Sequence, residues 1–394
     1  MEVKTKRLHF IDAMRAWAIL MMLQGHFVDG LLDPIFRDSG NSVYNLWLYF
    51  RGITAPVFFT VSGFIFTYLL IRVPQLGFDN PRIRKGIKRG IELLIIGYLL
   101  RLNLFGLLQG KLYDAFFLVD VLHCIGISIM VIIAVFLLTS RQKPWVMPAT
   151  LLGITLTLFL FEPIYSEWAY TWLPEAFANY FTRANGSVFT IIPWVGYTAF
   201  GAFLSVLFKK HAAKSNLYPS AIGLSAIVGI SLLYLSSPLF STIAEVSGIT
   251  LFSDIASNNY LFIRLGDVLI VFALFMVFRH YLTQPSLLRI GSNTLSIYVI
   301  HFVILYGSFT GLGLYRFFDH SLTPSVAITG AILFMIVCSY AALYYDTHET
   351  LIKSTIAQIL QKGKIGLSRL YFEFSKLLIV LQDKLLRAFN TSKG

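Results

Sequence analysis

Long, nearly uninterrupted hydrophobic runs recur along this 394-residue chain. Most are long enough for an α-helix to cross a bilayer, which takes about 20 apolar residues. Overall, 56% of the residues are hydrophobic and only 13% are charged, whereas soluble domains carry about 25% charged residues. A soluble enzyme, a secreted domain and a disordered chain are therefore excluded, and we predict an all-α, polytopic membrane helical bundle of about ten transmembrane helices. The runs span about 10–32, 46–71, 91–109, 115–139, 145–162, 188–208, 217–238, 259–281, 287–309 and 323–345.

The basic residues predict how the helices are oriented. With ten spans, most of the 32 Lys and Arg residues fall on one side of the membrane. They lie before the first run (Lys4, Lys6 and Arg7), in the connection 72–89, in later alternate loops and after the last run. By the positive-inside rule both termini are predicted to be cytoplasmic. The formal charge of +12 is then a sign of topology, so we expect membrane lipids and no nucleic acid as partners.

The composition changes after Tyr345. We predict a transmembrane domain over residues 1–345 and a basic amphipathic cytoplasmic tail over 346–394, in which Leu351, Ile352 and later apolar residues recur at helical spacing. Such a tail is expected to lie on an anionic inner leaflet and to carry no chemistry of its own. The first run lacks a small-residue cleavage site, so it is not expected to be a cleaved signal peptide.

The first run, residues 10–32, contains the most informative polar residues. Arg15 and His26 are eleven residues apart, which on an α-helix is three turns plus about 20°, so both side chains lie on one face. About 16 Å separates them along the axis, or about half the hydrocarbon thickness. Asp12 precedes Arg15, and Asp29 follows His26, each by one turn. Because an ionisable side chain in lipid costs several kcal/mol, this line of residues predicts a polar pocket that crosses much of the bilayer.

These residue types suit a reaction with an anionic cytosolic cofactor. A guanidinium near the inner surface suits phosphate groups. A histidine deeper in the membrane suits a general base that deprotonates an amine or hydroxyl. We interpret Arg15 as cofactor-binding and His26 as the base, with Asp29 fixing the tautomer of His26. The alternative is that Arg15 extends to the headgroups and His26 only hydrogen-bonds to a neighbouring helix.

Several motifs resemble membrane acyltransferases. Arg15, ten intervening residues and His26 match the Arg-x10-His signature of the acyltransferase-3 group. Four further segments, in the order of the chain, resemble a transmembrane acyltransferase superfamily and are closest to bacterial proteins with a heparan-α-glucosaminide N-acetyltransferase-like catalytic domain. They are FRGITAPVFFTVSGFIF (50–66), VDVLHCIGISI (119–129), PWVGYTAFGAFLS (193–205) and IGSNTLSIYVIH (290–301).

The resemblance implies an acyl-CoA-dependent acyltransferase, over about residues 10–345, in a bacterial-type cytoplasmic (inner) membrane. Acetyl-CoA would approach from the cytoplasm, with its phosphates on Arg15 and on the basic residues Arg84, Lys85 and Lys88. His26 would take a proton from an amine or hydroxyl of a sugar or glycan presented from the other side, in direct transfer. We expect no metal, and Cys124 and Cys338, which lie in separate runs, offer no metal or disulfide motif.

Other polar residues inside the runs have competing interpretations. Asp120 and His123, one turn apart, suit acceptor binding or a buried structural pair, and Arg101 is expected to pair with Asp120. Arg51 suits a contact with the sugar or an interfacial position. His301 suits substrate binding or a buried core histidine. We also expect a pair that satisfies itself between Arg264 and Asp267.

Acyltransferase-3 proteins often carry a soluble domain after the last span, and residues 346–394 do not resemble one. We therefore expect the outer loops of the membrane domain to recognise the acceptor. The sequence leaves open the identity of the acceptor, N- or O-acylation and the acyl chain length. It also leaves open whether a covalent acyl-enzyme forms in place of the preferred direct transfer, and whether the chain forms a homo-oligomer. A proton-coupled secondary transporter is the main alternative, because such relays also place His, Asp and Arg in the membrane. A non-catalytic scaffold is a third hypothesis.

Overall fold

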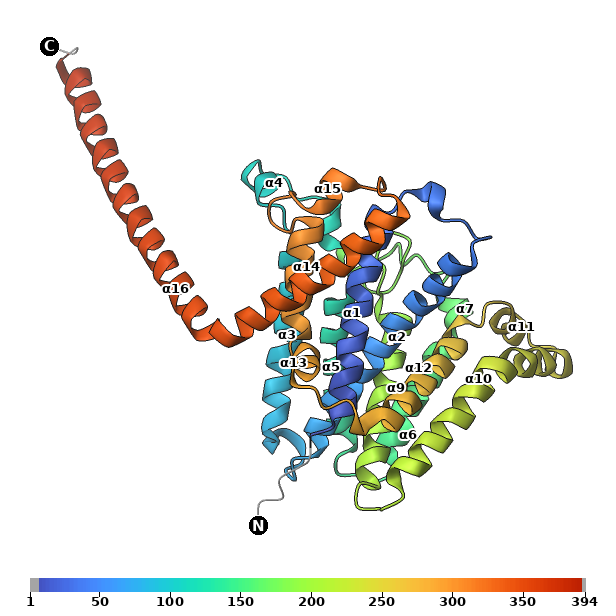
Figure 1. Cartoon of the computed structure of the whole chain (residues 1–394). Coiled ribbons are helices and arrows are strands. Elements are labelled where there is room, and N and C mark those ends of the chain that lie inside the picture. Colours follow the sequence, from blue (N-terminus) through green and yellow to red (C-terminus); the bar gives the residue numbers. More distant parts are fainter. Residues whose placement is uncertain (1–6, 392–394) are drawn as a thin grey trace. The chain divides into compact units, whose positions relative to one another are not determined.

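A computed structural model describes residues 7–391, without the side chains of residues 360, 367, 369–371, 373–375 and 377–391. Lys4 and Lys6, which contributed to the predicted orientation, lie outside the described residues. Within the described range the regular structure is helical and contains no β-strand, which confirms the all-α class (Figure 1). The chain divides into two compact units, residues 1–340 and 341–394.

The first unit contains fifteen α-helices, interspersed with short 3-10 or π turns, and the start of a sixteenth. The α-helices are α1 (His9–Leu31), α2 (Ser42–Ile71), α3 (Pro81–Arg101), α4 (Leu104–Leu108), α5 (Val121–Thr139), α6 (Val146–Leu160), α7 (Glu162–Tyr165), α8 (Glu175–Ala178), α9 (Ile191–Lys210), α10 (Leu217–Ser247), α11 (Thr250–Ser257), α12 (Tyr260–Val277), α13 (Pro285–Ser292), α14 (Thr294–His301), α15 (Leu314–Phe318) and α16 (Pro324–Thr391). The shorter turns are η1 (Pro34–Phe36), η2 (Gly77–Asp79), η3 (Asp114–Phe117), η4 (Phe278–His280) and the π-helical turn η5 (Phe302–Tyr306).

Six helices of the described chain are long and apolar enough to cross a membrane, and a bent pair makes up to seven. The six are α2, the segment ending in α5, α9, α10, α12 with η4, and the first part of α16. The bent pair is α13 with α14–η5, at 69°. The chain is thus a polytopic helical membrane protein.

The difference from about ten predicted spans has a physical basis. The 23-residue α1 is long enough to cross a bilayer, but Asp12, Arg15, His26 and Asp29 lower its hydropathy. Likewise, α3 begins with a basic stretch that lowers its hydropathy. The 15 residues of α6 are fewer than the about 20 that a helical span takes. The number of spans and the side on which each terminus lies stay predictions.

Polar side chains set where several long helices begin. The Oδ1 of Asn41 accepts hydrogen bonds from the first turn of α2, at 2.9 and 3.1 Å. Asn80 caps α3 in the same way, with Pro81 as its first residue. Asp120 caps α5. These caps satisfy backbone N–H groups that a helix start leaves unpaired.

Within the first unit, α1 packs against α2, α13 and α14, while α2 packs along α9, α3 along α5 and α10 along α12. Figure 1 shows α1 beside α13 and α14. Aromatic and aliphatic residues of α1, α2, α9 and α12 form a core at the end where α1 begins, with Phe10, Phe64, Phe208 and Phe272 at its centre. The predicted pair of Arg264 and Asp267 is present at 3.0 Å in α12.

In the second unit, residues 341–394, the described chain is the remainder of α16. A non-helical residue, His348, interrupts it with φ −113° and ψ 19°. The predicted domain boundary after residue 345 and the membrane-surface position of the tail stay predictions.

Candidate active site

The polar face of α1 lies against α13 and α14. Toward the start of α1, the Nη2 of Arg15 donates a hydrogen bond to the Oγ1 of Thr294 (3.1 Å). Toward the end of α1, the Nδ1 of His26 lies 3.0 Å from the Nε2 of His301. Thr294 and His301 are the first and last residues of α14. Arg15 and His26 therefore face the same neighbouring helix, as their spacing predicts.

The imidazoles of His26 and His301 form a pair with ring centroids 5.1 Å apart, and His301 is fully buried. In such a contact one nitrogen donates and the other accepts, so the tautomers of the two rings depend on each other. The Nδ1 of His301 is buried and has no hydrogen-bond partner among the described residues. When the Nδ1 of His26 donates in this contact, the Nε2 of His26 keeps a lone pair.

Two cavities meet at His26. One cavity, of about 250 Å³, is called the inner cavity because its α1 residues Met21 and Met22 lie nearer the start of α1 than His26. It is also lined by Phe58 of α2, by Trp194 of α9 and by Arg183, Val188 and Phe189 of the connection before α9. The outer cavity, about 510 Å³, extends from His26 past Asp29 and Asp120 to Tyr306. His26, Arg51, Val188 and Phe189 line both. A molecule in either cavity can therefore reach the same imidazole.

Asp29 forms an ion pair with Arg51 of α2. Asp29 was expected to fix the tautomer of His26; in the structure its carboxylate pairs with Arg51, and the Nδ1 of His26 contacts His301. A role of Asp29 in fixing that tautomer stays a prediction. Both members of the pair line the outer cavity. The contact holds α1 and α2 together where the two cavities join, which the sequence did not indicate.

Asp120 lines the outer cavity, and its Oδ2 accepts a hydrogen bond from Arg101 at 3.1 Å, as predicted. His123 was expected either to bind the acceptor or to form a buried structural pair with Asp120; the structure shows it in contact with Asp120, and acceptor binding stays a prediction. Its Nδ1 accepts from the backbone N–H of Asp120 (3.1 Å) and completes the cap of α5. The ring is fully buried against Tyr98, with centroids 4.3 Å apart, and it lines neither cavity.

The basic residues Arg84, Lys85 and Lys88 are exposed in the first half of α3, and Lys88 lies 3.9 Å from Glu92. They line neither cavity at His26. Arg15 is paired instead with Asp12, at 3.7 Å, and with Thr294. The structure therefore does not bring the four predicted cofactor-binding residues into one contact.

Two residues of this region, Thr294 and Tyr306, were not predicted from the sequence. Thr294 lies within the segment 290–301 that carried the resemblance, but nothing in that pattern indicated a partner for Arg15. Tyr306 ends the π-helical turn after His301 and lines the outer cavity. Such turns within helices are often found at functional sites, but a sequence pattern does not reveal them.

The fold and site thus define a polytopic membrane protein with a histidine pair where two cavities meet. Residues 7–240 match the family described as heparan-alpha-glucosaminide N-acetyltransferase, catalytic, and the chain belongs to this family. This confirms that part of the predicted resemblance and makes the chain a membrane enzyme of the acetyltransferase type. The match includes Arg15, His26, Arg51 and Asp120 but ends before His301. Among curated proteins, none matches the chain significantly.

Proposed function

We propose that the protein transfers an acetyl group from acetyl-CoA, bound from the cytoplasmic side, to an amine or hydroxyl of a sugar or glycan on the opposite side. His26 acts as general base. The observation that carries this proposal is the position of His26, where the inner and outer cavities meet. Membership of an acetyltransferase family supports the choice of reaction.

The inner cavity suits the acyl end of the donor. Met21, Met22 and Phe58 give it apolar walls, and such walls keep water from a reactive thioester. For the phosphates of CoA we propose Arg15 together with the exposed basic residues of α3 at the predicted cytoplasmic end. Arg15 would then exchange Asp12 and Thr294 for a phosphate oxygen, since a guanidinium binds phosphate with paired hydrogen bonds.

The outer cavity suits the acceptor. It presents the carboxylates of Asp29 and Asp120 together with the guanidinium of Arg51. Carboxylates accept hydrogen bonds from sugar hydroxyls, and guanidinium groups donate them. A sugar held there can direct one amine or hydroxyl toward His26.

The chemical step follows from this placement. The acceptor nitrogen or oxygen attacks the thioester carbonyl carbon while the Nε2 of His26 takes the acceptor's proton. The new C–N or C–O bond forms, the C–S bond breaks, and the thiolate of CoA leaves and takes the proton back from His26. His301 acts as a positioning residue because it holds His26 in the tautomer with a free Nε2. No covalent acyl-enzyme is required, since both substrates reach one base.

The test measures free thiol released from acetyl-CoA by the full chain in lipid nanodiscs, screened against amino sugars and glycan fragments. His26→Gln is expected to lower kcat about 10²- to 10⁴-fold, the range of general base catalysis. It should leave stabilisation by acetyl-CoA against heat unchanged. The control is His280→Gln, because His280 is an exposed histidine in η4 and its loss should leave the rate unchanged.

A wild-type rate in His26→Gln would show that the base is misassigned. If acetyl-CoA neither stabilises the wild-type protein nor is consumed, while the protein carries a sugar across vesicle membranes, the secondary transporter is the correct function.

A further inference from the structure

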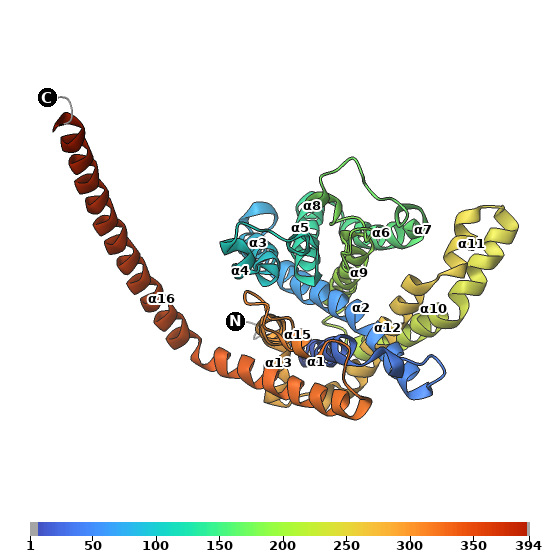
Figure 2. The same ribbon diagram turned by 90° about the horizontal axis from the view of Figure 1, so that it is seen from above.

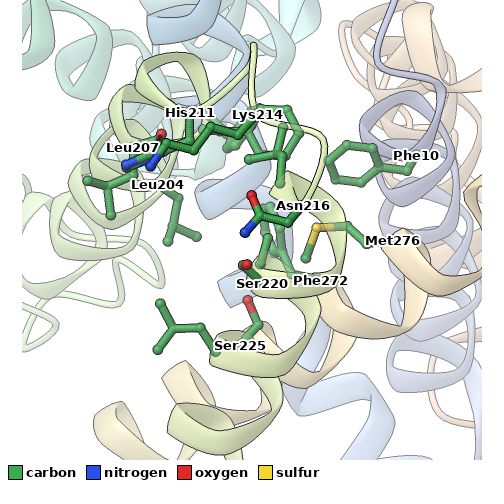
Figure 3. A pocket seen from close by; sticks show the side chains of 15 residues that line it. Phe10, Leu204, Leu207, His211, Lys214, Asn216, Ser220, Ser225, Phe272 and Met276 are labelled. Atoms are coloured by element: carbon green, nitrogen blue, oxygen red, sulfur yellow. Dashed lines mark hydrogen bonds between the residues drawn. The ribbon is translucent and has the colours of Figure 1, made fainter.

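A third cavity, of about 330 Å³, lies away from His26. Figure 3 shows its residues: Leu204 and Leu207 from α9 face Phe10, Phe272 and Met276 from α1 and α12. None of its lining residues lines the inner or outer cavity. It is therefore separate from the proposed reaction centre.

The cavity follows from the way α9 and α10 diverge. A short loop, residues 211–216, joins the two helices, but α9 packs along α2 and α6, whereas α10 packs along α12 and α11. Figure 2 shows α10 and α11 set apart from α9 and α6. Two consecutive spans that diverge in a membrane leave a wedge, and hydrocarbon must fill it because water has no polar partners there.

One end of the cavity is basic and polar. His211 and Lys214 lie at the loop, with Asn216 beside them, and Ser220 and Ser225 lie further along α10 (Figure 3). Lys209 and Lys210 end α9 at the same loop. This loop is predicted to be cytoplasmic, so the positive charge would face the inner leaflet.

We propose that this cavity binds one anionic phospholipid of the inner leaflet. An acyl chain lies against Phe10, Phe272 and Met276, and the phosphate meets Lys214 and His211. Charge complementarity supports this occupant, because the apolar wedge carries its basic groups at one end only, as an anionic amphiphile requires. Basic pockets between helices on the cytoplasmic side bind such headgroups. The lipid would fill the gap and fix α10 relative to α9.

The experiment uses the full chain in nanodiscs of equal parts phosphatidylglycerol and phosphatidylcholine, followed by detergent extraction and native mass spectrometry of the retained lipid. The wild type is expected to retain phosphatidylglycerol at least about fivefold over phosphatidylcholine, since one basic residue at an anionic surface gives about that factor. Lys214→Gln should reduce this retention about fivefold. Lys143→Gln, an exposed lysine of another loop predicted to be cytoplasmic, should not.

A second pair of variants tests the chain-binding part. Ser225→Phe places an aromatic ring in the cavity and should abolish retention, whereas Ser241→Phe changes an exposed serine of the same helix and should not. Equal retention of both lipids by the wild type, equal losses in Lys214→Gln and Lys143→Gln, or full retention in Ser225→Phe would each overturn the proposal. Because Lys214 is exposed, its variant stays informative even if Ser225→Phe does not fold.

Discussion

Gly201 in α9 lies where the backbones of α9 and α2 cross at very short distance. A Cβ atom on Gly201 would lie 1.8 Å from the backbone oxygen of Thr60, and one on Gly63 would lie 1.9 Å from that of Thr198. Small residues allow membrane helices to approach in this way. We predict that Gly201→Ala destabilises the protein because the added methyl group meets the backbone of α2.

The size of the effect follows from the geometry. Real Cβ atoms essentially never come within 3.0 Å of such an atom, so 3.0 Å minus 1.8 Å leaves about 1.2 Å by which the backbones must separate. Overpacking costs about 1–3 kcal/mol, and the upper end applies because a backbone oxygen in a helix cannot rotate away. The higher helix propensity of Ala returns up to about 1 kcal/mol. The free energy of unfolding should therefore fall by about 2 kcal/mol.

Thermal unfolding in detergent, followed by tryptophan fluorescence, measures this change. We expect a Tm lower by roughly 4 °C, since each kcal/mol moves the Tm of a domain of 150–250 residues by about 2–4 °C and that of a longer chain by less. Gly153→Ala is the matched control, because no heavy atom lies within 4 Å of its added Cβ. Its Tm should stay the same or rise slightly. Equal Tm values for the two variants would refute the close crossing of α2 and α9.

Two further predictions concern buried polar contacts. His301→Phe removes the hydrogen-bond partner of His26 but keeps a ring, so the rate of thiol release should fall at least about 10-fold, with the KM for acetyl-CoA unchanged. His301→Gln should restore part of that rate. Equal rates in the two variants would contradict a positioning role for His301. Asp267 is buried between Arg264 (3.0 Å) and the hydroxyl of Tyr49 (2.5 Å), so Asp267→Asn, which leaves a guanidinium without its counter-charge, should cost about 3–5 kcal/mol. Tyr49→Phe should cost roughly 1 kcal/mol, and a larger loss of thermal stability in Tyr49→Phe than in Asp267→Asn would refute the assignment.

Some contacts were predictable because they repeat along one helix. Arg15 and His26 share a face because eleven residues nearly complete three turns, and Arg264 meets Asp267 because three residues span one turn. The pairing of Arg101 with Asp120 was also predicted. That pairing joins α3 to the start of α5, two elements close in the chain and in the membrane.

Contacts between distant segments were not predictable in the same way. Nothing local indicates that His26 meets His301, 275 residues further on, or that Asp29 turns to Arg51. In the sequence, His123 is only a polar residue one turn after Asp120. Its role in capping depends on where α5 begins, and the structure shows that its Nδ1 accepts from the backbone N–H of Asp120. The register between two helices depends on the packing of the whole bundle, which a single pattern does not contain.

The sequence by itself determined that the chain is a helical membrane protein and which face of α1 is polar, because hydropathy and helical periodicity are properties of contiguous residues. The tertiary structure alone decided which nitrogen of which histidine faces His26, and that two cavities meet there. Those features arise where helices from distant parts of the chain pack together, at distances set by side-chain volume and by glycines such as Gly201.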